Sequence, residues 1–298
     1  PSPPPVSTVI ATPTPTTAPT AVIPPTGTPE PMPSSTPEIT GPPTPRPSPT
    51  EAPPLRNFDY NGDGTSDIAV FRPGTGLWAV RNLTRLYYGT ASDQPVPGDY
   101  DGDRTTDIAI FRKTTGLWAV RGIGRWYFGS SGDSPHPGDY DGDGVDEPAI
   151  FRPGSGLWAA RNITRLYYGN SSDSPFPGYY DTDAGKDIAI FREATGLWAI
   201  RGITRIYYGR SDDEPVAADY DGDDNNEAAI YRSSHGLWAV RGLTRIYFGT
   251  SSDRPLPGDW DGDGQAGIGI FRESSGLWAL RGMTRDYYGT TGDLPQGR

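Results

Sequence analysis

The stretch IAIFRKTTGLWAV (Ile108–Val120) consists of two short apolar runs separated by a polar turn that ends in glycine. Close copies occur six times in the chain, spaced 40 residues apart without insertions. Each copy keeps Gly-Leu-Trp-Ala intact and carries an aromatic residue followed by arginine; the aromatic residues are Phe71, Phe111, Phe151, Phe191, Tyr231 and Phe271. Short apolar runs bounded by turn residues are typical of β-strands. The stretch therefore predicts a β-hairpin that the chain repeats six times.

A repeat of about 40–45 residues with four short strands per unit is typical of a β-propeller blade. In the second unit we expect strands over Pro95–Tyr100, Ile108–Arg112, Leu117–Arg121 and Arg125–Phe128. Their apolar runs are continuous, which suits a sheet buried on both faces between neighbouring sheets. The sequence thus predicts an all-β fold in which residues 55–298 form a six-bladed β-propeller.

The two ends of the repeat region are in phase with each other. Phe58 and Arg298 are 240 residues apart, which is six periods of 40. The final segment Asp293–Gln296 corresponds in phase to Asp93–Val96 of the second unit. We therefore expect the C-terminal segment to complete the first blade and close the ring.

Residues 1–54 differ sharply in composition, with 20 Pro, 12 Thr and 5 Ser. Proline restricts φ and removes a backbone donor, so we expect an extended, polyproline II-like tail. Such Ser/Thr/Pro-rich segments are frequently O-glycosylated stalks, and a plain flexible linker is the alternative. Val6–Ala11 (VSTVIA) favours extended structure and suits pairing with an exposed sheet edge. We hypothesise self-association through this tail, leading to a filament.

Acidic residues are concentrated in a loop that precedes each hairpin, as in GDYDGDRTTD (Gly98–Asp107). Counted from Asp99 as position 1, acids fall at positions 1, 3, 5 and 9, with glycine at position 4. Oxygen ligands at alternate positions of a tight loop suit Ca²⁺ better than Mg²⁺, which demands stricter octahedral geometry. An EF-hand would need glutamate at position 12, where this loop has Ile110 in an expected strand. Asp/Gly turns without a metal remain the alternative.

The six loops carry unequal sets of candidate calcium ligands. We expect loops one, two, three and five to bind most strongly, because Tyr179 replaces the first acid of loop four and Gly267 the last acid of loop six. The candidate ligands are, in chain order, Asp59, Asn61, Asp63 and Asp67; Asp99, Asp101, Asp103 and Asp107; Asp139, Asp141, Asp143 and Glu147; Asp181, Asp183 and Asp187; Asp219, Asp221, Asp223 and Glu227; and Asp259, Asp261 and Asp263.

The acidic loop within a blade-length unit resembles the FG-GAP/VCBS repeats of integrin-α-like β-propellers. The resemblance covers all six units, residues 55–298. It departs from the family pattern where Phe-Gly is expected, because the chain has Tyr-Tyr-Gly or Tyr-Phe-Gly, and Gly-Ala-Pro is absent. The resemblance implies a propeller with calcium bound between strands at a rim of the ring, and it implies no reaction.

Charge and composition narrow the possible functions. The net charge of −11 argues against nucleic acid and anionic membrane surfaces as partners, and no apolar run is long enough to span a membrane. The absence of cysteine excludes disulfides and zinc thiolate sites. The candidate ligands include 21 of the 37 acidic residues, which predicts structural Ca²⁺. Extracellular calcium modules bind at about 10⁻⁴–10⁻³ M, so we expect an extracellular or cell-surface location.

No phosphate-binding, metalloprotease or nucleophile-elbow motif occurs, and the repeat is almost unbroken. We therefore expect a non-catalytic structural or adhesive protein. A lectin-like propeller that binds glycans as ligands is the alternative, and a polysaccharide lyase comes third. The repeated tryptophans are expected in the core between blades, whereas Trp126 and Trp260 are candidates for the surface. We expect the arginines fixed in each unit to contact tyrosine rings or the loop carboxylates, and a sixfold set of Arg/Tyr pockets for anionic or neutral sugars is the alternative.

Overall fold

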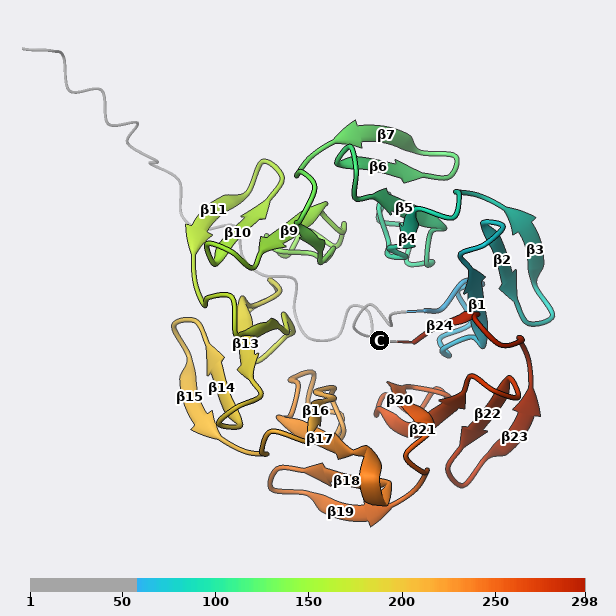
Figure 1. Cartoon of the computed structure of the whole chain (residues 1–298), viewed down its shortest axis with the longest axis vertical. Helices are drawn as coiled ribbons and strands as arrows, with labels where there is room; N and C mark the ends of the chain where they lie inside the picture. The colour runs from blue at the N-terminus through green and yellow to red at the C-terminus, as the bar shows by residue number, and fades with distance from the viewer. Residues whose placement is uncertain (1–57, 298) are drawn as a thin grey trace, which may run out of the picture. The chain divides into compact units, whose positions relative to one another are not determined.

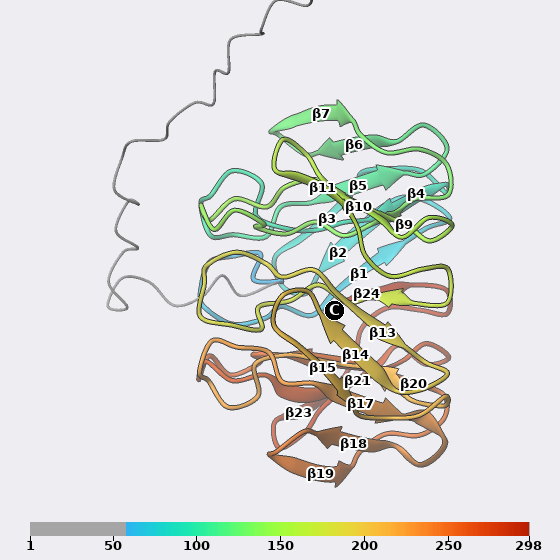
Figure 2. The ribbon, with the colours of Figure 1, turned by 90° about the vertical axis from the view of Figure 1, so that its left-hand side faces the viewer.

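The computed structural model describes residues 58–297, which form six four-stranded antiparallel sheets arranged as the blades of a ring (Figure 1). Within these residues the only helix is the short 3-10 turn η1 (Ser233–His235). In five blades the strands follow one another in chain order from the centre of the ring to its rim, and in the remaining blade the C-terminal strand is innermost. The turns that join them gather at the two faces of the ring (Figure 2). The predicted six-bladed β-propeller is confirmed.

The first three blades have the following strands, given from the centre outward. Blade one has β24 (Leu294–Gln296), β1 (Ala69–Arg72), β2 (Leu77–Val80) and β3 (Thr84–Tyr87). Blade two has β4 (Asp93–Pro95), β5 (Ala109–Arg112), β6 (Leu117–Val120) and β7 (Gly124–Tyr127). Blade three has β8 (Ser134–Pro135), β9 (Ala149–Arg152), β10 (Leu157–Ala160) and β11 (Thr164–Tyr167).

The other three blades repeat this order. Blade four has β12 (Ser174–Pro175), β13 (Ala189–Arg192), β14 (Leu197–Ile200) and β15 (Thr204–Tyr207). Blade five has β16 (Glu214–Pro215), β17 (Ala229–Arg232), β18 (Leu237–Val240) and β19 (Thr244–Tyr247). Blade six has β20 (Asp253–Gly258), β21 (Gly267–Arg272), β22 (Leu277–Leu280) and β23 (Thr284–Tyr287).

The innermost strand is shorter than the sequence predicts. In blade two the expected strand over Pro95–Tyr100 is replaced by β4 (Asp93–Pro95), which starts and ends earlier. Pairing continues only as a hydrogen bond from Val96 N to Ala109 O and an isolated bridge between Gly98 and Asp107. Blade six has proline at the equivalent positions, Pro255 and Pro257, yet its inner strand β20 continues to Gly258, so proline alone does not end β4.

The hydrophobic core lies between blades rather than within them. Trp78 and Phe71 of blade one pack against Ile108, Ile110 and Ala119 of blade two. The same arrangement recurs around the ring, and all six repeated tryptophans are at most 1% exposed. Each tryptophan therefore packs against the small alanine of the next blade, and the core position expected for these tryptophans is confirmed.

The glycine of the Gly-Leu-Trp-Ala motif is required by the backbone of the hairpin turn. Gly116 has a φ of +68°, and a Cβ at this position would lie 2.5 Å from the carbonyl oxygen of Gly129. Gly116 O also accepts a hydrogen bond from Phe128 N, which fastens the turn to the outer strand. No side chain fits this approach, so the motif begins with glycine in every blade.

The C-terminal segment closes the ring as expected. β24 pairs with β1, with Leu294 opposite Phe71 and Gln296 opposite Ala69. In Figure 1 the last strand of the chain lies beside the first. The first blade is therefore built from both ends of the repeat region.

Adjacent blades are also joined through the backbone of their acidic loops. The N–H at position 8 of each loop donates to the C=O at position 1 of the preceding loop, over 2.5–2.7 Å. The six donors are Ser66, Thr106, Asp146, Lys186, Asn226 and Ala266. The loops thus form a closed circle of backbone hydrogen bonds.

Some expectations differ from the structure or lie outside it. Trp260 is only 7% exposed and packs in the core against Trp278, so its expected surface location is wrong. Trp126 is half-buried against Tyr100, with the guanidinium of Arg161 above its ring. The expected tail over residues 1–54 and the boundary at residue 55 lie outside the described residues. Within residues 58–297 there is no helix long and apolar enough to cross a membrane.

Candidate metal centres

The first acid of each loop organises the loop through its own backbone. Asp99 is buried, and its Oδ1 accepts a hydrogen bond from Gly102 N at 2.7 Å while Oδ2 accepts one from Arg104 N at 2.8 Å. Asp59, Asp139, Asp219 and Asp259 accept equivalent bonds from the backbone of their loops. A carboxylate has about four lone-pair sites. Asp99, which accepts these two bonds, therefore keeps acceptor capacity for a cation.

The last acid of the loop ties its end back to its beginning. Asp107 Oδ2 accepts a hydrogen bond from Tyr100 N at 2.9 Å, and Glu147 Oε2 accepts one from Tyr140 N at 2.9 Å. Burial, together with the neighbouring acids of the loop, raises the pKa of Asp107 to about 6. The same causes raise the pKa of Glu147 to about 7. A divalent cation in the loop would offset the repulsion that contributes to these shifts.

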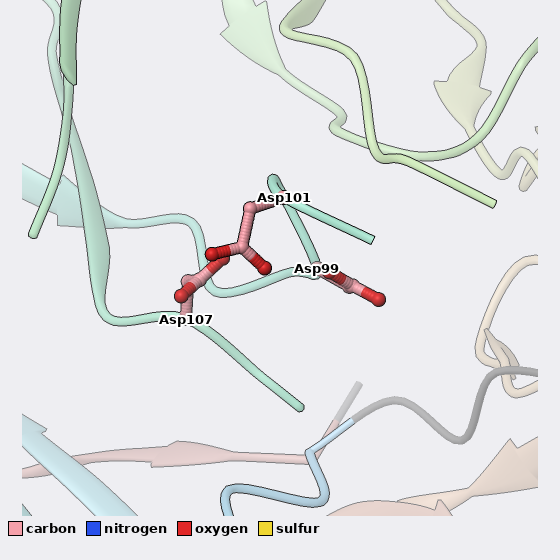
Figure 3. Close-up of side chains that lie close together, drawn as sticks. All are labelled: Asp99, Asp101 and Asp107. Carbon is pink, nitrogen blue, oxygen red and sulfur yellow. The ribbon is translucent and has the colours of Figure 1, made fainter. Parts of the chain in front are cut away.

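Three carboxylates converge in loops two, three and five, each time from positions 1, 3 and 9. Within each group one oxygen of every residue lies within 4.8 Å of the others. Figure 3 shows the group in loop two, with Asp101 beside Asp107 and Asp99 across the turn. The groups are Asp99, Asp101 and Asp107; Asp139, Asp141 and Glu147; and Asp219, Asp221 and Glu227.

The acid at position 5 lies outside these three groups. Asp103 Oδ1 accepts hydrogen bonds from Thr105 N at 2.8 Å and Thr105 Oγ1 at 2.6 Å. Asp143 and Asp223 likewise accept the N–H two residues later. In these loops the position-5 side chain is therefore engaged with its own turn.

Loop six brings three acids together by a different route. Its group is Asp259, Asp261 and Asp263, from positions 1, 3 and 5. Gly267 has no carboxylate, and the backbone there is part of strand β21. The loop that we expected to be weakened thus retains a convergent group of three carboxylates.

Loops one and four contain no convergent group of three acids among the described residues. In loop one an amide, Asn61, stands at position 3, and its Nδ2 donates to Asp63 Oδ2 at 2.9 Å. In loop four Tyr179 stands at position 1, and Lys186 Nζ lies 6.0 Å from its ring centroid. Lys186 Nζ also donates to Pro137 O of blade three at 3.2 Å. The ammonium group of Lys186 therefore lies next to loop four, which lacks the first acid.

The convergent groups fit a hard cation. Their ligand atoms are all carboxylate oxygens, with no nitrogen or sulfur, and an oxygen-only donor set favours Ca²⁺ or Mg²⁺ over transition metals. Three carboxylates fill only part of a calcium shell of six to eight oxygens, so backbone carbonyls and water would complete it.

Sequence reasoning missed a second repeated acid. Asp93 lies outside the acidic loop and is fully buried, and Arg112 binds it with both Nε at 2.7 Å and Nη2 at 2.8 Å. Thr90 N donates to the same carboxylate. The pair occurs in every blade as Arg72–Asp293, Arg112–Asp93, Arg152–Asp133, Arg192–Asp173, Arg232–Asp213 and Arg272–Asp253.

These pairs correct the expected partners of one of the three arginines fixed in each unit. The arginine after each aromatic residue binds this separate aspartate and not the carboxylates of the acidic loop. The repeated aspartate was visible in the sequence, because every unit contains an aspartate followed two residues later by proline, as in Asp93 and Pro95, but this spacing does not indicate its partner. Bidentate geometry explains why these six positions hold arginine and not lysine.

The Arg–Asp pairs should make the protein sensitive to acid. Burial raises the pKa of Asp93, but hydrogen bonds from Arg112 and Thr90 outweigh burial and lower the pKa below its ordinary value. A lowered pKa stabilises the fold above about pH 4, and this stabilisation is lost as the pH falls through the folded-state pKa. We expect the melting temperature to fall below pH 4 by less in Asp93→Asn than in the wild type. Equal slopes in differential scanning calorimetry would contradict this prediction.

The ring of six four-stranded sheets defines the protein as a β-propeller, and the fold is similar to solved structures with little shared sequence. BBS1N, crystallised in complex with ARL6DN and soaked with mercury, has a TM-score of 0.50 and 9% identity, over 80% of this chain and 83% of that chain. Virginiamycin B lyase from Staphylococcus aureus has a TM-score of 0.48 and 7% identity, over 79% and 84%.

A lectin from Agrocybe aegerita, solved for its recognition of non-reducing terminal N-acetylglucosamine, has a TM-score of 0.49 and 15% identity, over 80% of this chain and 78% of that chain. At these identities the likeness concerns the fold alone. No family model and no curated protein matches the sequence.

Proposed function

We propose that the chain is a non-catalytic, extracellular β-propeller of the FG-GAP/VCBS type, stabilised by calcium, with a structural or adhesive role. The convergence of three carboxylates in each of four loops carries this proposal. Asp99, Asp101 and Asp107 would hold the ion in loop two, and the equivalent residues would hold it in loops three, five and six. Calcium supplies positive charge that offsets the repulsion within each group.

The role of the ion is structural because of where the loops lie. The C=O of Asp99 accepts the hydrogen bond from Asp146 N of the next blade, so the residue that would bind calcium also joins two blades. Fixing the Asp99 side chain would therefore fix the junction between blades two and three. The proposal includes an extracellular setting, because calcium modules with affinities of about 10⁻⁴–10⁻³ M are filled only where calcium is abundant.

The proposal includes self-association through the Pro/Thr-rich tail. The composition of the tail and the extended propensity of VSTVIA (Val6–Ala11) support it. Sedimentation of the full chain in calcium, compared with a chain lacking residues 1–54, tests it. A full chain that remains monomeric at high concentration would contradict it.

Calcium binding is tested by isothermal titration of the metal-stripped protein. We expect at least four ions per chain, and Asp107→Asn should reduce the count by one because it removes a ligand of the loop-two group. Asp187→Asn in loop four is the matched control and should leave the count unchanged. Absence of calcium uptake at millimolar concentration would overturn the proposal.

A glycan-binding propeller is the second candidate function. One observation favours it: each blade presents a highly exposed tyrosine on its outer strand, and the exposed fractions range from 69% for Tyr167 to 76% for Tyr127. Aromatic rings that remain in solvent in every repeat are not explained by core packing.

A further inference from the structure

The rim of the ring is formed by six outer hairpin segments, residues 81–88 and their equivalents at intervals of 40, here called the rim segments. Together they contain 12 arginines and one carboxylate, Asp286, although the whole chain has a net charge of −11. Asp286 forms an ion pair with Arg81. The rim is therefore a basic surface on an acidic protein.

Each outer strand has an arginine and a tyrosine two residues apart, so both side chains lie on the same face of the sheet. In β3 the residues Thr84–Tyr87 are alternately half-buried and exposed, with Arg85 and Tyr87 exposed. Across the sheet, Arg72 pairs with Leu77, and Leu77 pairs with Tyr87. Paired residues of an antiparallel sheet share a face. Blade one thus presents Arg85, Tyr87 and Arg72 together on one face, and the other blades have their equivalents 40 residues apart.

The inner arginine of this face is held in place before any ligand binds. Asp293 fixes Arg72 through Nε and Nη2, which leaves Nη1 outside the pair, and the Arg72 side chain is 34% exposed. The outer arginine is available for pairing. Within residues 58–297 no ion pair involves Arg85 or its equivalents Arg125, Arg165, Arg205, Arg245 and Arg285. A guanidinium that keeps free donors binds carboxylate or sulfate groups well.

We propose that the rim segments form a six-fold binding surface for an anionic polysaccharide. The tyrosines provide flat faces for the sugar rings, and the arginines bind the carboxylate or sulfate groups. The proposal rests on the adhesive role proposed above and specifies its ligand class. The six tyrosines are Tyr87, Tyr127, Tyr167, Tyr207, Tyr247 and Tyr287.

The arrangement favours a polysaccharide over single-stranded nucleic acid. Proteins that bind single strands stack successive bases on aromatic residues along one groove. Here the exposed tyrosines lie singly, one on the outer strand of each blade. Six equivalent and individually weak contacts bind a long chain through avidity.

Binding is measured with the full chain in calcium on surfaces coated with dextran sulfate, polygalacturonate or neutral dextran. We expect salt-sensitive binding to the two anionic polymers and none to dextran. Replacing all six tyrosines with serine should weaken binding by about 100-fold, and a single Tyr127→Ser by less than about threefold, because avidity masks the loss of one site.

The matched control replaces the exposed aliphatic residues at the hairpin tips, Leu83, Ile123, Ile163, Ile203, Leu243 and Met283, with serine. This variant should bind within about twofold of the wild type, since the Arg–Tyr face is intact. Undiminished binding by the six-tyrosine variant would overturn the proposal, because bridging of the polymer by calcium at the acidic loops would then explain it. Tighter binding to single-stranded DNA than to either polymer would also overturn it.

The melting temperature of each variant, with calcium and with EDTA, separates this proposal from the proposed function. A calcium-stabilised propeller without affinity for either polymer refutes the rim site alone. If binding depends on the tyrosines but EDTA leaves the melting temperature unchanged, only the structural role of calcium is refuted.

Discussion

Removal of calcium with EDTA should lower the free energy of unfolding by about 2–6 kcal/mol. At about 10⁻³ M calcium and a dissociation constant of about 10⁻⁴–10⁻³ M, linkage contributes roughly 0.4–1.4 kcal/mol per site. Four loops contain convergent acids, so the contributions add over four sites. For a domain of this size the melting temperature should fall on the order of 10 °C.

Differential scanning calorimetry in calcium, in EDTA, and in EDTA followed by excess calcium measures this effect. Magnesium should restore only a part of the loss, because it tolerates irregular oxygen geometry poorly. Asp139→Asn, which removes a ligand of loop three, should show a smaller EDTA effect than the wild type. Identical melting temperatures with and without EDTA would refute structural calcium.

Asp293→Ala should lower the free energy of unfolding by about 2–3 kcal/mol and loosen the ring at its closure. The fully buried carboxylate accepts hydrogen bonds from Arg72 and from Thr290 N, and its removal leaves these donors unpaired. Breaking a buried ion pair costs roughly 3–5 kcal/mol, and the figure is reduced here because Arg72 is one-third exposed.

Asp173→Ala is the matched control for ring closure. Asp173 binds Arg192 with the same geometry, but its blade is continuous along the chain. Both variants should lose similar stability by chemical denaturation. Only Asp293→Ala should increase hydrogen exchange in β24, because β24 is held to the first blade without a covalent connection to β1. Equal exchange of β24 in both variants would contradict this prediction.

The blade architecture could be predicted from the sequence, because the same apolar runs and turn residues occur six times at an unbroken spacing of 40 residues. Trp118 and Ala119 lie on opposite faces of one sheet, and both faces are buried against neighbouring blades. The strand is therefore apolar throughout. Closure by Asp293–Gln296 followed from its phase with Asp93–Val96. In each case the information is local and periodic.

The features that were missed depend on contacts between residues distant in the sequence or on small differences between copies. Asp93 and Arg112 are 19 residues apart, and a fixed acid offers no sign of its partner before strands pair. The innermost strand of blade two was placed too far along the chain, and its prolines do not explain the difference, because blade six has the same two prolines in a continuous β20. In loop six Asp263 belongs to the convergent group, although Gly267 predicted a weakened loop. The spacing of acids in the sequence does not show which way each side chain points within a turn.

The circle of backbone hydrogen bonds has a consequence for how the repeat tolerates change. Position 1 contributes its side chain to the candidate metal site but its carbonyl group to the next blade, and only the side chain depends on residue type. At Tyr179 the carboxylate is gone, yet Tyr179 O still accepts the hydrogen bond from Asn226 N at 2.5 Å. A loop is therefore free to lose its first carboxylate by mutation without losing its backbone hydrogen bond to the next blade, so individual loops can change in sequence while the propeller persists.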